Sequence, residues 1–160
     1  MRQKVIIVWF KRDLRVFDHA PLADAVAAAA VAADAAVLPL FVVEPDYWQL
    51  PTSSRRQWCF VHDCLNELDA SLASLGQRLI IRIGEMVNML DDLARIVDIT
   101  AIYAHEETGD AWTYARDRNV AAYCQRAKIA FYESPANGVV RRLNHRNEWA
   151  AIRHQRMQAN

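Results

Sequence analysis

The chain has 160 residues, of which 53% are apolar and 24% charged, so it is long enough to bury a core and too apolar to be disordered. Its 19 basic and 19 acidic side chains cancel, which argues against a surface that binds nucleic acid through net charge. Three cysteines without a CxxC pair indicate reduced thiols in a cytoplasmic protein rather than a disulfide framework or zinc site. The alanine-rich residues 20–40 are interrupted by Asp24, Asp34 and Pro39, so we expect no membrane span.

Six consecutive apolar residues, 5–10 (VIIVWF), predict a strand that is buried on both faces, as in parallel sheets covered by helices. The run ends at a charged cluster formed by Lys11, Arg12, Asp13 and Arg15. In open α/β sheets, ligand sites lie just past the carboxyl ends of such strands. The charged cluster is therefore where a ligand site is expected.

Farther along the chain, apolar runs that predict strands alternate with periodic patterns that predict helices. Pro21 suits the first turn of the first helix, and Ser54 and Gly76 can begin and end the second. Pro39 lies within the second apolar run, although proline cannot donate to a strand ladder. The later strands are predicted at residues 36–43, 79–83, 101–104 and 129–132, and the helices near residues 21–33, 55–75, 86–97 and 112–123.

Five strands that alternate with four helices predict an α/β fold with a doubly wound, five-stranded parallel sheet and helices on both faces. The flavodoxin-like strand order 3-2-1-4-5 is expected for this strand count. Its switch point lies between strands 1 and 4. The loop at residues 11–15 should therefore face the loop at residues 105–110 across one crevice.

The last residues, 134–160, differ in character from the residues before them. Pro135, Asn137 and Gly138 predict a turn, and a helix is expected within residues 144–157. Arginines such as Arg141 and Arg142 make this segment locally basic. We therefore predict an α/β domain at residues 1–133 and the start of a connection at residues 134–160.

The residues exclude two common kinds of site. No glycine follows the first strand, so neither a GxGxxG loop nor a Walker A loop is present. His105, Glu106 and Glu107 resemble a metal-binding group, but an HExxH motif would need histidine where Gly109 stands. The sequence favours salt-bridged carboxylates over a metal site. It offers no catalytic dyad or triad.

Two interpretations of the charged cluster remain open. Arg12, Asp13 and Arg15 can clamp an anionic ligand, or they can pair with one another and with carboxylates across the crevice. The nearby Trp9 and Phe10, together with Phe41 and Trp112, can form core, or they can form a slot for a planar ring.

Four segments resemble the photolyase and cryptochrome family. Residues 8–25 (VWFKRDLRVFDHAPLADA) resemble the opening strand and W-F-R-x-D-L-R motif of the family, with Lys11 in place of an arginine. Residues 53–84 are similar to its long second helix and following strand, and residues 105–124 to its fourth strand and R-D helix. Residues 137–150 resemble a bacterial branch of photolyase-like proteins.

The resemblance implies a light-dependent DNA repair flavoprotein of the deoxyribodipyrimidine photolyase type, a carbon–carbon lyase. In this family the amino-terminal α/β domain can hold an antenna pigment, a deazaflavin, flavin or folate, which transfers excitation energy to FAD. A helical carboxy-terminal domain, absent here, would bind FAD and damaged DNA. This fragment is then expected to be monomeric and inactive alone. The alternatives are a cryptochrome photoreceptor without repair activity, or a free-standing nucleotide-binding module.

The resemblance also implies which residues line the antenna pocket. In the family this pocket is formed at the ends of strands 1, 2 and 4. Residues 105–110 (HEETGD) depart from the pattern of folate binders. The matching positions in this chain are Trp9, Phe10, Arg12, Asp13, Phe41, Val43, Glu106 and Glu107.

Overall fold

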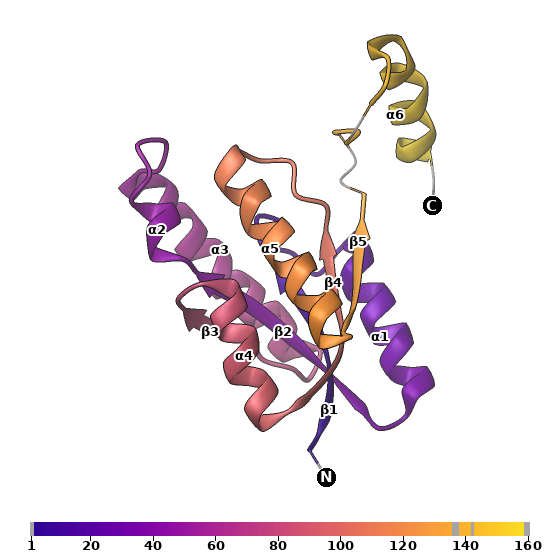
Figure 1. The fold of residues 1–160 in the computed structure, drawn as a ribbon. Helices are drawn as coiled ribbons and strands as arrows, with labels where there is room; N and C mark the ends of the chain where they lie inside the picture. Colours follow the sequence, from indigo (N-terminus) through magenta and orange to yellow (C-terminus); the bar gives the residue numbers. More distant parts are fainter. Residues whose placement is uncertain (1, 136–137, 142, 159–160) are drawn as a thin grey trace.

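The computed structural model describes residues 2–135, 138–141 and 143–158, and it forms one sheet with helices on both faces (Figure 1). The strands are β1 (Lys4–Phe10), β2 (Ala35–Val43), β3 (Ile80–Ile83), β4 (Asp98–His105) and β5 (Ala130–Ser134). The helices are α1 (Ala20–Ala32), α2 (Pro45–Trp48), α3 (Arg55–Ser74), α4 (Met86–Ile96), α5 (Ala111–Ala127) and α6 (Trp149–Gln158), with a 3-10 turn η1 (Arg146–Glu148) before α6.

All neighbouring strands are parallel, and their order is β3-β2-β1-β4-β5. The predicted fold class and strand order are thus confirmed. β1 lies at the centre, with Phe10 opposite Phe41 of β2 and Val8 opposite Tyr103 of β4. The carboxyl ends of three strands therefore meet where the sequence placed the expected site.

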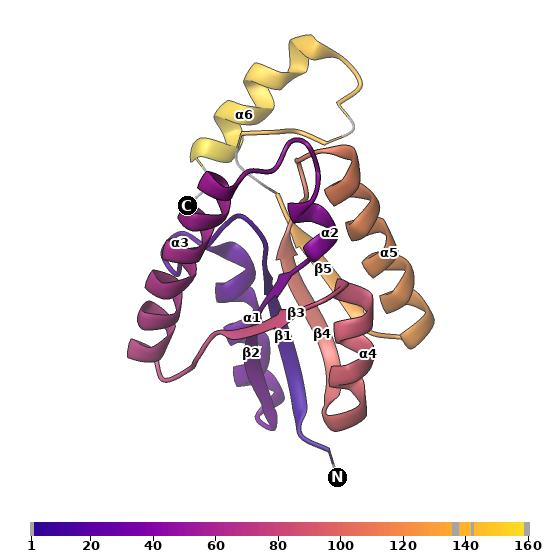
Figure 2. The same ribbon diagram turned by 90° about the vertical axis from the view of Figure 1, so that its left-hand side faces the viewer.

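β1 is buried on both faces, because its side chains alternate between two cores. Val5, Ile7 and Trp9 belong to a cluster that includes residues of α4 and α5, such as Leu90 and Val120. The intervening side chains, Ile6, Val8 and Phe10, pack in a second cluster with Ala25 of α1 and the leucine stripe of α3 (Leu65, Leu68 and Leu72). Figures 1 and 2 show α4 and α5 on one face of the sheet and α1 and α3 on the other.

Local signals explain where several elements begin and end. Ser54 caps α3, because its hydroxyl accepts a hydrogen bond from the backbone N–H of Gln57. Gly76 follows this helix with φ of +88°, a conformation that favours glycine. Pro39 is tolerated in β2 because β3 starts opposite Leu40, so at Pro39 one edge of β2 has no strand to pair with.

The structure differs from the prediction in several places. Residues 45–48 form the short helix α2, which Pro45 and Asp46 favour in its first turn, whereas the sequence analysis predicted no element there. β4 begins at Asp98, three residues before the predicted start. The predicted carboxy-terminal helix is present as α6, beyond the carboxyl ends of the strands (Figure 2), but it starts at Trp149.

Two features of the basic segment, Asn137 and Arg142, lie outside the described residues. β5 ends at Ser134, and the domain boundary at residues 133/134 stays a prediction. α6 is held by hydrogen bonds from Trp149 to the carbonyl of Gly138 and from Arg156 to that of Val139. None of the helices described is long and apolar enough to cross a membrane.

Candidate functional site

Two hollows lie at the carboxyl edge of the sheet. The smaller, about 350 Å³, separates the loop after β1 from the end of β4 and is called the charged cleft; its lining includes Arg12, Asp13, Arg15, His105, Glu106 and Glu107. The predicted crevice between the loops at residues 11–15 and 105–110 is therefore present. The larger hollow, about 720 Å³, is called the aromatic pocket; its walls include Trp9, Phe10, Phe41, Tyr47, Trp48 and Phe60.

The structure brings most of the predicted site residues to one of these hollows. Trp9, Phe10 and Phe41 line the aromatic pocket, Asp13 and Glu106 line the charged cleft, and Arg12 and Glu107 contribute to both. Val43 lines neither hollow, because its side chain packs against the core on the α3 side. The aromatic residues are core and pocket wall at once, since Trp9 is 1% exposed and Phe10 is fully buried.

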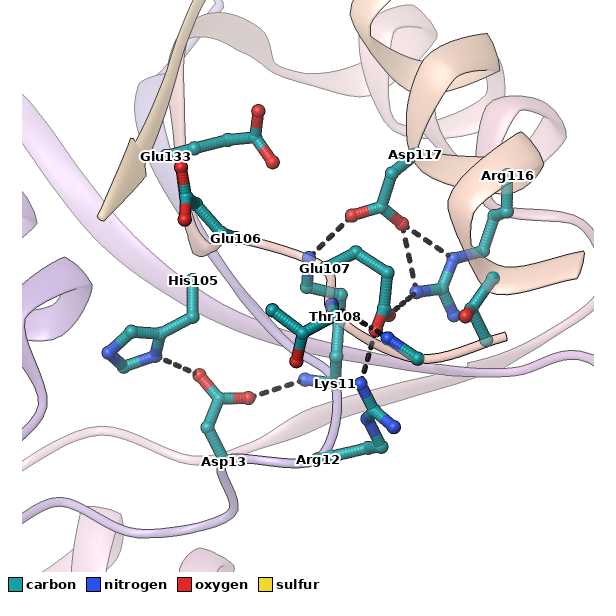
Figure 3. Close-up of polar contacts among 12 residues, drawn as sticks. Lys11, Arg12, Asp13, His105, Glu106, Glu107, Thr108, Arg116, Asp117 and Glu133 are labelled. Atoms are coloured by element: carbon teal, nitrogen blue, oxygen red, sulfur yellow. Dashed lines mark hydrogen bonds and ion pairs between the residues drawn. The ribbon is translucent and has the colours of Figure 1, made fainter. Parts of the chain in front are cut away.

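Glu107 lies between the two hollows, and its side chain is buried, at 2% exposed. Its Oε1 accepts hydrogen bonds from the backbone N–H groups of Thr108 and Gly109, at 2.8 and 2.7 Å, and from the guanidinium of Arg12. Its Oε2 accepts from Nη2 of Arg116 at 2.9 Å (Figure 3). A Cβ at position 109 would lie within 3.0 Å of side-chain atoms of Thr113, Arg12 and Glu107, so these side chains would have to shift to admit any residue other than glycine.

Arg116 of α5 connects the acids that the sheet brings together. Its guanidinium donates to Glu44 at 3.0 Å, to Glu107 at 2.9 Å and to Asp117 at 2.9 Å. Burial alone would lower the pKa of Arg116, but Asp117 and Glu44 raise it above its ordinary value. The guanidinium therefore stays charged in a site that excludes most solvent.

Glu44 ties this network to the next helix. Its Oε1 accepts a hydrogen bond from the backbone N–H of Met86, the first residue of α4, at 3.1 Å. Burial raises the pKa of Glu44 above its ordinary value, and Arg116 and the Met86 amide oppose that rise. Lys11 pairs with Asp117, which completes a network of three cations and three carboxylates: Lys11, Arg12 and Arg116 with Glu44, Glu107 and Asp117. Arg12 is the exposed member of this network, and the other five side chains are largely buried.

Two of the cations also contact the indole of Trp9. Nζ of Lys11 and Cζ of Arg116 both lie 4.8 Å from the ring centroid. Cations at this distance from an aromatic face are attracted by its quadrupole. Trp9 is thereby fixed in orientation as one wall of the aromatic pocket.

Asp13 contacts two histidines rather than an arginine. Its Oδ2 lies 2.7 Å from Nε2 of His19 and 2.5 Å from Nδ1 of His105, and its Oδ1 accepts from the backbone N–H of Lys11. Burial acts to raise the pKa of Asp13, but the hydrogen bonds from His105 and His19 outweigh it and hold the pKa well below its usual range.

These three side chains are also close enough together to suggest a metal site. Nδ1 of His19, however, accepts a hydrogen bond from the backbone N–H of Leu22, as the cap of α1. The proton of a neutral His19 must then be on Nε2, the atom that faces Asp13. Because metal ligation needs an unprotonated nitrogen, the cap opposes binding of a metal at Nε2.

The sequence analysis did not assign Glu44, His19, Arg116 or Asp117 to a site. Glu44 stands directly after a strand, as Lys11 does, and the rule that locates ligand sites at carboxyl ends applies to it equally. Asp117 is 5% exposed on a helix face that also holds the buried Val120, and a carboxylate among apolar positions signals a buried partner.

Comparisons with known proteins agree with this arrangement. Residues 6–148 match the family model for DNA photolyase. The chain is 37% identical over 111 residues to cryptochrome DASH of Oryza sativa subsp. japonica, which covers 65% of this chain and 18% of that protein. It is 31% identical over 126 residues to deoxyribodipyrimidine photo-lyase of Synechococcus sp., which covers 78% of this chain and 24% of that protein.

Solved structures show the same fold. The Synechocystis sp. PCC6803 cryptochrome aligns with a TM-score of 0.75 at 20% identity, over 86% of this chain and 28% of that one. The archaeal photolyase from Sulfolobus tokodaii aligns with a TM-score of 0.71 at 24% identity, over 98% of this chain and 35% of that one. The chain spans 18% of the length of the Oryza cryptochrome DASH and 24% of the length of the Synechococcus photo-lyase. On this evidence, the chain belongs to the DNA photolyase family.

Proposed function

We propose that this chain binds an antenna pigment in the aromatic pocket and transfers excitation energy to FAD held by another part of the protein. The observation that carries the proposal is the pocket of about 720 Å³ at the carboxyl ends of β1 and β2. Its volume falls within the range of pockets that enclose cofactor-sized ligands.

The residues of the pocket fit a planar pigment. Trp9 is contacted by Lys11 and Arg116 on one face of the sheet, and Phe10 and Phe41 are buried on the other face. Energy transfer needs a fixed pigment orientation and little water, and rigid aromatic walls supply both. No side chain has to act as a general acid or base for this role.

A flavin-type pigment is the class that we favour. The photolyase from Sulfolobus tokodaii was crystallised with two FAD molecules, which for that protein implies a novel light-harvesting cofactor. A flavin or deazaflavin has a planar ring system, which suits a pocket with several aromatic side chains in its lining. Residues 105–110 depart from the folate-binding pattern, which weighs against a folate.

For the whole protein we propose deoxyribodipyrimidine photolyase activity, with FAD and damaged DNA bound outside this chain. The Synechococcus relative named as a photo-lyase supports this proposal. A cryptochrome photoreceptor is the second candidate, because the Oryza relative is named cryptochrome DASH. A repair assay on DNA that contains pyrimidine dimers separates them, since a photoreceptor would leave the dimers intact under blue light.

The pigment is tested by an absorption spectrum of the purified full-length protein, with extraction of its pigments. We expect FAD and a second pigment. Val61→Trp, which fills the pocket, should remove the second pigment and retain FAD, whereas Asn66→Trp on the exposed side of α3 should retain both. If wild-type protein holds FAD alone and takes up no added flavin or deazaflavin, the antenna proposal is wrong.

A further inference from the structure

The basic side chains that line the aromatic pocket outnumber the acidic ones, and the acids are already paired. Both acids in its lining, Glu44 and Glu107, already accept from Arg116, and Glu107 also accepts from Arg12. Lys11 is paired with Asp117. Two basic side chains in the lining, Arg15 and Arg56, are left without a buried acid, so the pocket keeps a positive charge.

These two arginines differ in their availability. Arg15 donates to the carbonyls of Phe17 and Asp18 in its own loop, and it lies 3.9 Å from the Asp18 carboxylate. Arg56 is exposed and has no hydrogen-bond or ion-pair partner among the described residues. Arg56 is therefore the cation in the pocket wall that is best placed to bind an added anion.

The side of α3 that faces the pocket is polar at one end and apolar at the other. Arg56 and Gln57 lie in the first turn, and Phe60, Val61 and Cys64 follow one and two turns later on the same side. Phe60 is 70% exposed although it is apolar and lines the pocket. A ligand with an apolar ring toward Phe60 and Val61 and a charged tail toward Arg56 would match this gradient.

Arg56 does not stabilise the helix that carries it. The amino terminus of a helix has a partial positive charge, so a cation in the first turn of α3 is unfavourable. The same partial charge adds to the attraction that Arg56 exerts on an anion. The pair of adjacent arginines supplies a control, because Arg55 lies in the same turn but outside the pocket lining.

We propose that the aromatic pocket selects a pigment whose planar ring carries an anionic tail, and that Arg56 is the specificity-determining residue that binds this tail. The inference rests on the proposed pigment-binding function. It narrows the ligand from flavins in general to flavins that carry a phosphate or a similar acidic group.

The test compares riboflavin with riboflavin 5′-phosphate, which have the same ring, by flavin fluorescence on titration with the 160-residue chain. A charge-assisted hydrogen bond contributes enough to make the phosphorylated flavin bind about tenfold tighter or more. Arg56→Gln should bring the two affinities within about threefold, whereas Arg55→Gln should keep the wild-type preference. Added salt should reduce the preference in wild type, because it screens an exposed pair.

The outcomes distinguish the two proposals. Equal affinities in wild type, or equal effects of Arg55→Gln and Arg56→Gln, would overturn the role of Arg56 and leave the pigment site intact. Absence of binding for both flavins would contradict the flavin site, and the inference about its tail would be overturned with it. Circular dichroism of the two variants checks that α3 is retained.

Discussion

Nζ of Lys11 lies 2.5 Å from Oδ2 of Asp117, although the two residues are 106 positions apart in the chain. Both side chains are nearly excluded from solvent, at 5% and 6% exposed. The pair joins the end of β1 to α5 and lies beside Trp9. Because a buried charge without a partner is costly, this contact holds one wall of the aromatic pocket in place.

Lys11→Met should therefore destabilise the fold by about 3 kcal/mol, since it leaves Asp117 with Arg116 as its one remaining cation among the described residues. Urea unfolding measures the change, and Lys11→Met/Asp117→Leu should recover part of it in a double-mutant cycle. Lys4→Met is the matched control, because the Lys4–Asp34 pair is exposed and its loss should have little effect. Equal losses for Lys4→Met and Lys11→Met would contradict the role of the buried pair.

Asp13→Asn should lower stability near neutral pH by about 2 kcal/mol, because it weakens the hydrogen bonds from His19 and His105. The pKa of Asp13 is lower in the folded state than its ordinary value of 3.8, so its contribution is fully present above about pH 4. The contribution is lost as the pH falls from there toward the folded-state pKa.

The stability gap between wild type and Asp13→Asn should thus narrow only below about pH 4, as measured by urea unfolding from about pH 7 to about pH 3. Asp92→Asn serves as the control, since Asp92 is exposed and pairs with Arg95 on the surface of α4. A gap that closes already between about pH 7 and about pH 5 would mean that Asp13 is not the group responsible.

Zinc should not stabilise the protein through the cluster of Asp13, His19 and His105. The cap that His19 provides to Leu22 leaves its proton on Nε2, where a metal would have to bind. We expect no rise in Tm as zinc is added to protein freed of metal with EDTA. A concentration-dependent rise that His105→Ala abolishes would show that the cluster does bind metal.

His19→Asn should be milder than His19→Ala by about 1 kcal/mol, because asparagine can still cap α1 whereas alanine cannot. Both variants lose the hydrogen bond to Asp13, so the difference between their free energies of unfolding reports the contribution of the cap. Thermal unfolding of the two variants side by side measures it. Equal stabilities would indicate that the cap at position 19 contributes nothing.

The cysteines should differ in reactivity toward a thiol reagent. Cys59 is exposed, whereas Cys124 is buried, and burial raises the pKa of the Cys124 thiol to about 11. At about pH 8 we expect Cys59 to react in the folded protein and Cys124 to react only after unfolding. Cys59→Ser should remove the fast phase, and Cys124→Ser should leave it unchanged.

Local sequence patterns were sufficient for most of the fold. The apolar run at residues 5–10 indicated burial on both faces, because only a central strand covered by helices on both sides can bury such a run. The alternation of strands and helices restricted the topology to a parallel sheet with right-handed crossovers. Periodic patterns do not reveal short helices, because a helix of one turn such as α2 is too short to show a period.

The site was predicted less completely, for reasons that differ from residue to residue. Arg12 and Glu107 were expected to lie across a crevice, and they are joined in an ion pair. Asp13 was expected near arginines or a pigment, yet it lies between His19 and His105, because its short side chain reaches only its own loop and the end of β4. Val43 shares its strand with Phe41 but packs against the core instead of either hollow.

The positions of the charged residues along the chain were thus enough to locate the site, at the edge where β1, β2 and β4 end, and the motifs were enough to indicate the family. Which side chains form ion pairs was decided only by tertiary packing: the packing of α5 on the sheet brings Asp117 to Lys11. The packing of α3 likewise places Arg56, but not Arg55, in the pocket wall. A strand pattern depends on neighbours in sequence, whereas an ion pair or a pocket depends on contacts between elements that lie far apart in the chain.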